Sequence, residues 1–374
     1  MQNISIFPGS LIVLKNLLNE IKPKKIYLVT GRDSFSKSGA KDKLGWMDSK
    51  YNVIHFSDFN TNPTYEDVIR GVKKIQKEEC DLLLSIGGGS TIDITKLINY
   101  YRNIPTEKIS KKNTSYLNFI PLRHISIPLT AGSGSESTHF AVVYQGNEKF
   151  SIANEKLLPE FVIIDPELHL SQSNYQKAVS GIDALAQAIE SYWSVNSTEE
   201  SLKYSDTALK LIWSNLNSVV NGNDINSALL LSLGANLAGK AINITKTTAP
   251  HAFSYGFTKF AGLPHGHAVA LTLKLFTELN YNVNETNCND IRGVDHVSAI
   301  LNKVLNIIES SESFNNLFKN IKIETDIKKL NITNSILKKV VNNVNIERLV
   351  NNPVKIDKSE IIRLLTNRSD DYID

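Results

Sequence analysis

Short apolar runs alternate with helical segments between residues 25 and 165, and this alternation limits the folds open to the chain. The helical spacing covers residues 66–79 and 91–101. The apolar runs are typical of buried strands and fall at 25–30, 52–56, 81–86, 124–128 and 161–165. Because consecutive parallel strands need helical crossovers, we expect an N-terminal α/β domain with a mainly parallel sheet.

The second half of the chain changes character after about Ser173, where the apolar spacing becomes mostly helical. The candidate helices cover residues 181–194, 201–215, 225–241, 265–279 and 296–309. This pattern predicts an all-α C-terminal domain. We place the boundary near residues 166–175, which gives an α/β domain over 1–170 and a helical domain over 171–374.

Charge and cysteine content exclude several classes of protein. Lys plus Arg is 41 and Asp plus Glu is 38, so the formal charge of +3 gives no reason to expect nucleic-acid binding. Cys80 and Cys288 are too far apart to indicate a disulfide framework or a cysteine metal cluster. Pro8 and Gly9 interrupt the apolar N-terminus, and no apolar run approaches a membrane span. We therefore expect a cytoplasmic protein without membrane contact.

A run of glycines follows the third candidate strand. Gly87, Gly88 and Gly89 stand between an apolar run and a helical segment, followed by Ser90 and Asp93. Glycines allow the backbone to approach a pyrophosphate, and the helix then presents its free N–H groups to the anion. The alternative is an ordinary strand-to-helix turn, because this is not the common Gly-x-Gly-x-x-Gly fingerprint.

A second loop of small and hydroxyl residues follows the fourth candidate strand, over 128–136. It contains Thr130, Ser133 and Ser135. An irregular surface loop is the alternative. Two such loops after two strands of one sheet favour a dinucleotide at the carboxyl ends of those strands.

Metal-ligating residue types gather in the helical half. Asp183 and Gln187 are four residues apart on one predicted helix and so face the same way, while His251 and His265 bracket a short segment. One carboxylate and two imidazoles are enough to hold a divalent metal with open positions. Taken singly, Asp183 is equally a helix cap, and each histidine a core or surface residue.

Several motifs follow one another along the chain: Gly87-Gly-Gly-Ser-Thr-Ile-Asp93, Pro128-Leu-Thr-Ala-Gly-Ser-Gly-Ser-Glu136, Ile164-Asp-Pro-Glu-Leu168, Gly181-Ile-Asp-Ala-Leu185, Leu263-Pro-His-Gly-His267 and Asn352-Pro353. In these motifs the chain resembles the iron-containing (group III) alcohol dehydrogenases over nearly its whole length. The resemblance implies a dinucleotide-binding domain, a helical domain, an active site in the cleft between them and a homo-oligomer.

The resemblance implies a metal site of one Asp and three His, with Fe²⁺ or Zn²⁺ as the ion. Asp183, His251 and His265 match three positions, whereas Gln187 stands where His is commoner in the family. A Gln carbonyl oxygen is a weaker, neutral donor. The metal is implied to act as a Lewis acid on an aldehyde oxygen while a nicotinamide donates hydride. Tyr255, which replaces another active-site His of many relatives, or His267 would relay the proton.

Residues after the first strand bear on the choice between NAD(H) and NADP(H). NAD-preferring relatives tend to have Asp where this chain has Gly31. Gly31 leaves room, and Arg32, Ser34 and Lys37 are suited to a 2′-phosphate. We therefore expect NADPH to be preferred, the alternative being that Arg32 and Lys37 are ordinary solvated charges.

The segments 183–198 and 239–251 most resemble the hydroxyethylphosphonate dehydrogenase, or phosphonoacetaldehyde reductase, branch of the family. That branch implies reduction of phosphonoacetaldehyde to 2-hydroxyethylphosphonate. Lys240 and Lys246 are candidates to contact the phosphonate, with exposed surface lysines as the alternative. Three other functions remain open: a dehydrogenase for another small or sugar-derived aldehyde, a sugar-phosphate cyclase of the same fold, and a nucleotide-binding protein without activity.

Overall fold

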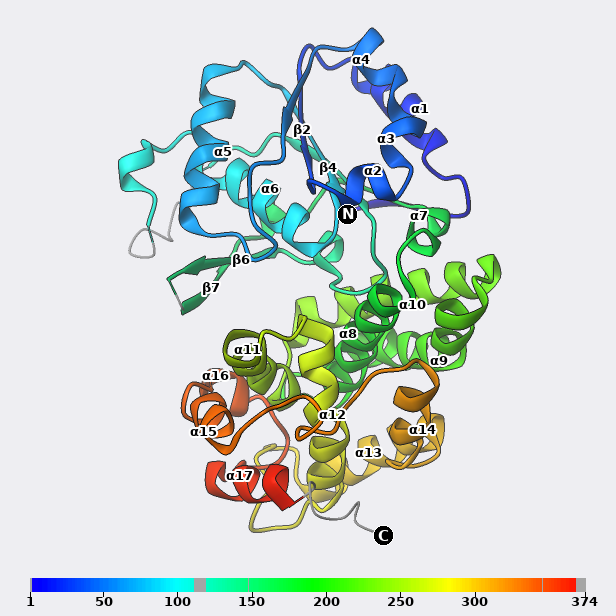
Figure 1. The fold of residues 1–374 in the computed structure, drawn as a ribbon, viewed down its shortest axis with the longest axis vertical. Coiled ribbons are helices and arrows are strands. Elements are labelled where there is room, and N and C mark those ends of the chain that lie inside the picture. The colour runs from blue at the N-terminus through cyan, green and yellow to red at the C-terminus, as the bar shows by residue number, and fades with distance from the viewer. Residues whose placement is uncertain (1, 111–118, 147, 345, 368–374) are drawn as a thin grey trace. The chain divides into compact units, whose positions relative to one another are not determined.

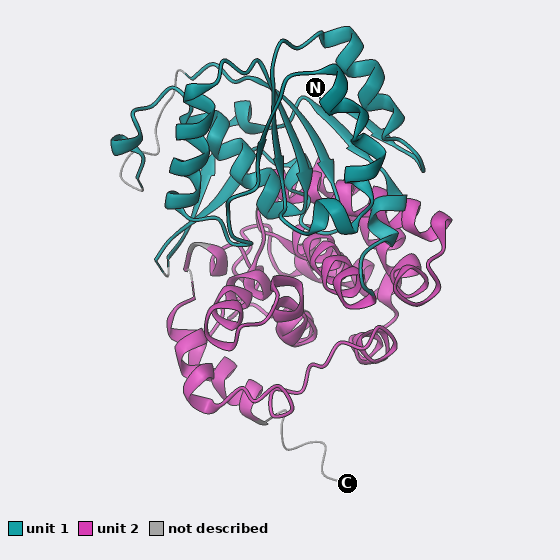
Figure 2. Cartoon of the chain, turned by 45° about the horizontal axis from the view of Figure 1, so that its top comes forward, with its two compact units in different colours: residues 1–173 teal, residues 174–374 magenta. Residues whose placement is uncertain are grey.

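The computed structural model describes residues 2–110, 119–146, 148–344 and 346–367. Its internal contacts divide the chain into two compact units, residues 1–173 and 174–374 (Figure 2). Among the described residues, each unit has a hydrophobic core made of its own side chains. The sequence order of α/β unit followed by helical unit is as predicted.

A six-stranded parallel sheet forms the centre of the first unit, within its described residues, and its strand order is β1-β8-β5-β4-β2-β3. A separate antiparallel hairpin is made by β6 and β7. The strands are β1 (Asn3–Ile6), β2 (Ile26–Thr30), β3 (Val53–Phe56), β4 (Leu82–Gly87), β5 (Arg123–Pro128), β6 (Phe140–Gln145), β7 (Glu148–Ala153) and β8 (Phe161–Ile164).

Helices cover both faces of this sheet (Figure 1). In β2, Ile26 and Leu28 face a cluster with α1, while Tyr27 and Val29 face a cluster with α5 and α6. Because both faces are buried there, the central strands β2 and β4 consist mostly of apolar residues, which made them recognisable in the sequence. The helices of this unit are α1 (Ile12–Ile21), α2 (Ser34–Lys37), α3 (Ala40–Leu44), α4 (Trp46–Lys50), α5 (Tyr65–Lys77), α6 (Gly89–Tyr101) and α7 (Pro166–Leu170).

The second unit is helical. Its elements are α8 (Asn174–Trp193), α9 (Glu199–Gly222), α10 (Ile225–Thr245), α11 (Ala249–Ala261), α12 (His265–Tyr281), α13 (Val294–Ile308), α14 (Ser313–Asn320), α15 (Asn334–Asn342), α16 (Ile346–Leu349) and α17 (Lys358–Asn367). Helix α10 alone among the described helices is long and apolar enough to cross a membrane. It packs against α8 and α9 and is mostly buried, as expected of a core helix.

Helix α12 approaches α8 closely at Gly266. A Cβ atom added at Gly266 would lie 2.0 Å from the backbone oxygen of Val179 in α8. Backbone atoms cannot move aside as a flexible side chain can, so the first turn of α12 requires glycine at this position. The contact holds the start of α12 against the turn of α8 that precedes Asp183.

We predict that Gly266→Ala lowers the free energy of unfolding by about 2–3 kcal/mol, because the added methyl group forces the two helices apart. Urea unfolding followed by circular dichroism measures this loss. Gly222→Ala is the matched control, because a Cβ at the end of α9 meets nothing within 4 Å. Equal stability of the two variants would contradict the role assigned to Gly266.

Candidate functional site

The glycine run predicted to bind phosphate lies between β4 and α6. Gly88 is the N-cap of α6, which begins at Gly89. A Cβ at Gly87 would lie 2.1 Å from the hydroxyl oxygen of Thr91, and one at Gly89 would lie 2.6 Å from that of Ser133. Side chains are therefore excluded from this turn, which leaves the N–H groups of the first helical turn accessible to an anion.

The structure brings together the predicted cofactor residues from three neighbouring strands. Gly88 lies opposite Thr130 of the loop after β5, since a Cβ atom added at Gly88 would lie 3.7 Å from the Thr130 hydroxyl oxygen. A Cβ at Gly31, after β2, would lie 3.7 Å from the hydroxyl oxygen of Thr91 in α6. Ser90 donates a hydrogen bond to the backbone oxygen of Thr61. These positions at the carboxyl ends of adjacent parallel strands suit a dinucleotide.

Two charged residues of α6 hold the loop that follows β5. Asp93 accepts hydrogen bonds from the Ser135 hydroxyl and from the Val142 N–H, the latter at 3.0 Å. The buried ammonium of Lys96 donates to the backbone oxygens of Ser135 at 2.5 Å and Thr138 at 2.7 Å. Burial lowers the pKa of Lys96 to about 8. Asp93 and Lys96 thus position the loop, and Lys96 was not identified from the sequence.

Arg32, expected to meet a 2′-phosphate, is paired with an acidic residue. Its Nη2 lies 2.8 Å from Oδ1 of Asp58, just beyond β3. Arg70 contacts the other oxygen of Asp58 at 3.0 Å and also pairs with Asp67. The four side chains carry no net charge together, so Arg32 is not a free cation available to a 2′-phosphate.

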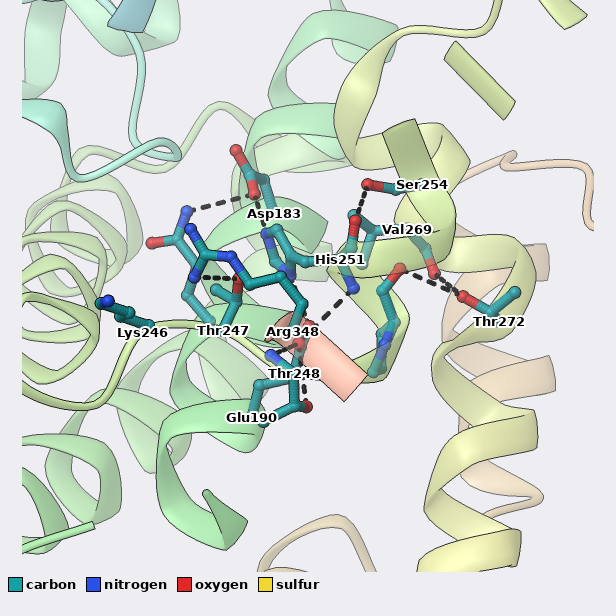
Figure 3. Close-up of polar contacts among 12 residues, drawn as sticks. Asp183, Glu190, Lys246, Thr247, Thr248, His251, Ser254, Val269, Thr272 and Arg348 are labelled. Carbon is teal, nitrogen blue, oxygen red and sulfur yellow. Dashed lines mark hydrogen bonds and ion pairs between the residues drawn. The ribbon is translucent and has the colours of Figure 1, made fainter. Parts of the chain in front are cut away.

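The predicted metal ligands come from three helices of the second unit and lie together. Figure 3 shows two of them, Asp183 and His251. Asp183 is in the middle of α8, His251 in the first turn of α11, and His265 is the first residue of α12. One ligand atom from each lies within 4.8 Å of the others. The structure therefore assembles the cluster that the sequence analysis selected.

The two imidazole Nε2 atoms converge on one carboxylate oxygen. Nε2 of His251 lies 3.0 Å from Oδ1 of Asp183, and Nε2 of His265 lies 3.9 Å from the same atom. Two ligands of a tetrahedral ion with bonds of about 2.1 Å are about 3.4 Å apart. The residues present thus fit a divalent cation such as Fe²⁺ or Zn²⁺, with Asp183, His251 and His265 as its ligands.

Buried partners hold both imidazoles by their other nitrogen. Nδ1 of His251 is hydrogen-bonded to Glu190, whose side chain has no solvent exposure. Nδ1 of His265 lies 3.3 Å from the Ser254 hydroxyl, which donates to the backbone oxygen of His251 at 2.7 Å. Partners of this kind leave Nε2 as the coordinating atom. Glu190 was missed in the sequence, although its position seven residues after Asp183 on one helix was a usable signal.

Neighbouring charges shift the pKa values of Asp183 and His251. Burial opposes ionisation of Asp183, but the neighbouring His265 and His251 hold the pKa of its carboxyl below the usual value. Burial also opposes protonation of His251, yet the flanking carboxylates of Glu190 and Asp183 raise its pKa to about 10. A cation must displace this proton from His251, so metal binding releases protons and strengthens as the pH rises.

The side chain of Gln187 is buried beside the cluster, where its Nε2 donates to Oδ1 of Asp183 at 3.1 Å. In this orientation the amide supports the carboxylate. Ligation of a metal by Gln187 requires its amide to turn so that the carbonyl oxygen faces the ion.

The two candidate proton-relay residues differ in their surroundings. The Tyr255 ring stacks on the His265 ring, with centroids 5.5 Å apart and planes 5° from parallel. His267 is buried, and its Nε2 donates to the backbone oxygen of Glu324 at 2.6 Å while its Nδ1 lies 2.8 Å from the Tyr175 hydroxyl. These contacts favour a structural role for His267 and leave Tyr255 as the better candidate.

We predict that Glu190→Gln weakens metal binding about 10- to 100-fold, because an amide N–H facing Nδ1 stabilises the imidazole tautomer whose Nε2 carries hydrogen. Competition with a chromophoric chelator for Zn²⁺ measures the Kd without any assay of activity. The control is Glu199→Gln, an exposed residue of α9. A wild-type Kd for the Glu190 variant would contradict the role proposed for this carboxylate.

Comparison with known proteins agrees with this architecture. Residues 2–166 match the iron-containing alcohol dehydrogenase family, and residues 177–369 match the C-terminal domain of the Fe-containing alcohol dehydrogenase family. In structure, the chain is similar to sulfoacetaldehyde reductase from Bifidobacterium kashiwanohense in complex with NAD⁺. The TM-score is 0.86 at 26% identity, over 98% of this chain and 97% of that one.

Two curated relatives illustrate the range of the sequence similarity. Phosphonoacetaldehyde reductase of Streptomyces viridochromogenes is 29% identical over 250 residues, 64% of this chain and 63% of that protein, so the match spans less than two thirds of its length. NAD-dependent methanol dehydrogenase of Bacillus methanolicus is 28% identical over 84% of this chain and 87% of that protein. Because the two family matches cover both units, the chain belongs to the iron-containing alcohol dehydrogenase family.

Proposed function

We propose that the protein reduces a small aldehyde to its alcohol, using a reduced nicotinamide and a divalent metal. The observation that carries this proposal is the convergence of the His251 and His265 Nε2 atoms on Asp183. The glycine turn at the start of α6 further supports the binding of a dinucleotide cofactor. Both features fall within the two family matches.

The reaction moves a hydride to the carbonyl carbon and a proton to the carbonyl oxygen. A divalent cation supplies Lewis acidity toward that oxygen, and a nicotinamide supplies the hydride. Asp183, His251 and His265 hold the cation, and Glu190 and Ser254 orient the two imidazoles. Tyr255, stacked on His265, is the proposed proton donor, while His267 is less suited to that step because both its ring nitrogens have protein partners.

For the substrate we propose phosphonoacetaldehyde, with 2-hydroxyethylphosphonate as the product. Two similar proteins support this choice, a phosphonoacetaldehyde reductase by sequence and a sulfoacetaldehyde reductase by structure. Both names describe a two-carbon aldehyde with an acidic tail. Other relatives act on uncharged alcohols by name, including 1,3-propanediol and 1-propanol dehydrogenases, so a neutral small aldehyde is the alternative.

We also infer that the enzyme works in the cytoplasm. The chain has two cysteines in 374 residues, Cys80 and Cys288, and such a low content is typical of proteins in a reducing compartment.

We predict that the purified protein consumes NADH or NADPH when phosphonoacetaldehyde is added, with one nicotinamide oxidised per aldehyde reduced. Prolonged chelation should abolish the activity, and Fe²⁺ or Zn²⁺ should restore it. Loss of reduced-nicotinamide absorbance is the readout, and propanal, glycolaldehyde and sulfoacetaldehyde complete the panel. Conversion of a sugar phosphate without net nicotinamide oxidation would instead indicate a cyclase of the same fold, and no turnover of any aldehyde would contradict the proposal.

The choice of nicotinamide depends on the charges that follow β2 and β3. Gly31 carries no carboxylate to repel a 2′-phosphate, and the neighbouring Arg32 could meet that phosphate only by leaving its ion pair with Asp58. Asp58, however, pairs with both Arg32 and Arg70 and would lie close to any phosphate bound by Arg32. We propose that NADPH is accepted and that Asp58 limits the preference for it.

We predict that Asp58→Asn increases the ratio of kcat/KM for NADPH to kcat/KM for NADH by about three- to tenfold, because removal of the carboxylate frees Arg32 for the 2′-phosphate. The effect should weaken at high salt, since both Arg32 and Asp58 are more than half exposed. Asp48→Asn, an exposed residue of α4, is the control. An unchanged ratio would remove Asp58 from cofactor selection, and a strong wild-type preference for NADH would contradict the NADPH expectation.

A further inference from the structure

A basic side chain from far along the sequence reaches the connection between α10 and α11. Arg348, in the short helix α16, is partly buried, and its Nη1 lies 3.3 Å from the hydroxyl oxygen of the buried Thr247. Figure 3 shows Arg348 in the same close-up as Asp183 and His251, with its guanidinium beside Thr247. No feature of the sequence identified this residue.

Thr247 is joined to the metal cluster through the next residue. The N–H and the hydroxyl of Thr248 both donate to Oε2 of Glu190, at 2.6 and 3.0 Å. The other oxygen of Glu190 is hydrogen-bonded to His251. Asn351 also donates to the backbone oxygens of Thr245 and Thr247, at 2.9 and 3.0 Å, and so fixes the connection. Arg348 is therefore held at a defined place next to the residues that orient a metal ligand.

Arg348 differs from the other cations near the site in its pairing. Within the part of the chain that the structure describes, it forms no ion pair with a carboxylate, and Asp183 and Glu190 are engaged with the imidazoles. Lys246 is exposed and points away from Asp183 and His251 in Figure 3. Lys240 has its ammonium over the Tyr204 ring, 5.9 Å from the centroid. A half-buried guanidinium without a carboxylate partner is suited to bind an oxyanion.

We propose that Arg348, with the hydroxyl of Thr247, binds the anionic tail of the substrate, so that the enzyme selects short aldehydes ending in a phosphonate or sulfonate. This inference rests on the proposed aldehyde reduction and assigns its specificity to α16. The roles proposed above for the metal ligands and for the proton donor are unchanged. A guanidinium beside a hydroxyl offers several N–H donors and one O–H to the tetrahedral group, while the aldehyde end is left for the metal cluster.

Arg348→Met tests the assignment through selectivity. The ratio of kcat/KM for phosphonoacetaldehyde to kcat/KM for propanal should fall about a hundredfold, as expected for loss of hydrogen bonds to a charged group. The corresponding ratio for sulfoacetaldehyde should also fall, because its sulfonate tail would meet the same guanidinium. Arg348→Lys should recover part of the ratio, because it restores the charge without the planar fork. Lys303→Met, an exposed position of α13, controls for the change in net charge.

A ratio that is unchanged in Arg348→Met and reduced in Lys246→Ala would overturn the proposal and assign the tail to Lys246. Binding provides a second readout that needs no turnover. Methylphosphonate should raise the Tm of the metal-loaded wild type and of Lys303→Met, and should have no effect on Arg348→Met. If no aldehyde is reduced, the proposed function fails, yet this thermal shift still tests Arg348. Equal shifts in all variants would overturn the anion site while leaving aldehyde reduction intact.

Discussion

The hydrogen bond between the buried Glu190 carboxylate and Nδ1 of His251 is the contact on which the metal cluster depends. A fully buried carboxylate is stable only if its oxygens are well satisfied, and Glu190 meets this need with Thr248 and His251. The same bonds fix the connection between α10 and α11. They also turn the imidazole so that Nε2 faces Asp183, which lies on the same helix as Glu190. The Glu190 side chain thus fixes both the backbone between α10 and α11 and the orientation of the His251 imidazole.

The first unit uses a buried charge in a comparable way. Lys96 holds the backbone oxygens of Ser135 and Thr138 in a region that solvent does not reach, and Asp93 accepts from Ser135 on the same loop. The loop is thereby kept next to Gly88 and Gly89, where side chains would meet Thr130 or Ser133. In both units, buried polar groups position irregular backbone at the ends of regular elements, where the candidate ligands lie.

The sequence predicted most reliably those strands and helices that are determined by a local pattern of residues. The central strands β2 and β4 are buried along their whole length and consist mostly of apolar residues, so their runs were recognisable without any knowledge of their neighbours. Helix α11 was missed because it contains Pro250 and Gly256, which normally interrupt helices. Pro250 lies in its first turn, where no N–H is needed, and Gly256 packs against the backbone of Val340. Strand β1 was also missed, since it is only four residues long and pairs with the distant β8.

The candidate site likewise contains residues that the sequence indicated and residues that only the structure identified. The types of residue at 183, 251 and 265 indicated a metal, and the structure brings them together. Glu190, Ser254 and Arg348 act through contacts with distant segments, and no local pattern marks such contacts. The pairing of Arg32 with Asp58 likewise joins the ends of two strands, so the charge that Arg32 offers to a cofactor was not evident from its neighbours in sequence.

The proposed function requires Asp183, His251 and His265 to hold one divalent cation together. X-ray absorption spectroscopy of the protein loaded with one equivalent of Zn²⁺ or Fe²⁺ examines the ligands directly. We expect nitrogen and oxygen ligands at about 2.0–2.2 Å from the ion, together with the outer-shell scattering of two imidazoles. A spectrum without imidazole scattering, or with sulfur in the first shell, would show that the ion lies elsewhere and would contradict the claim.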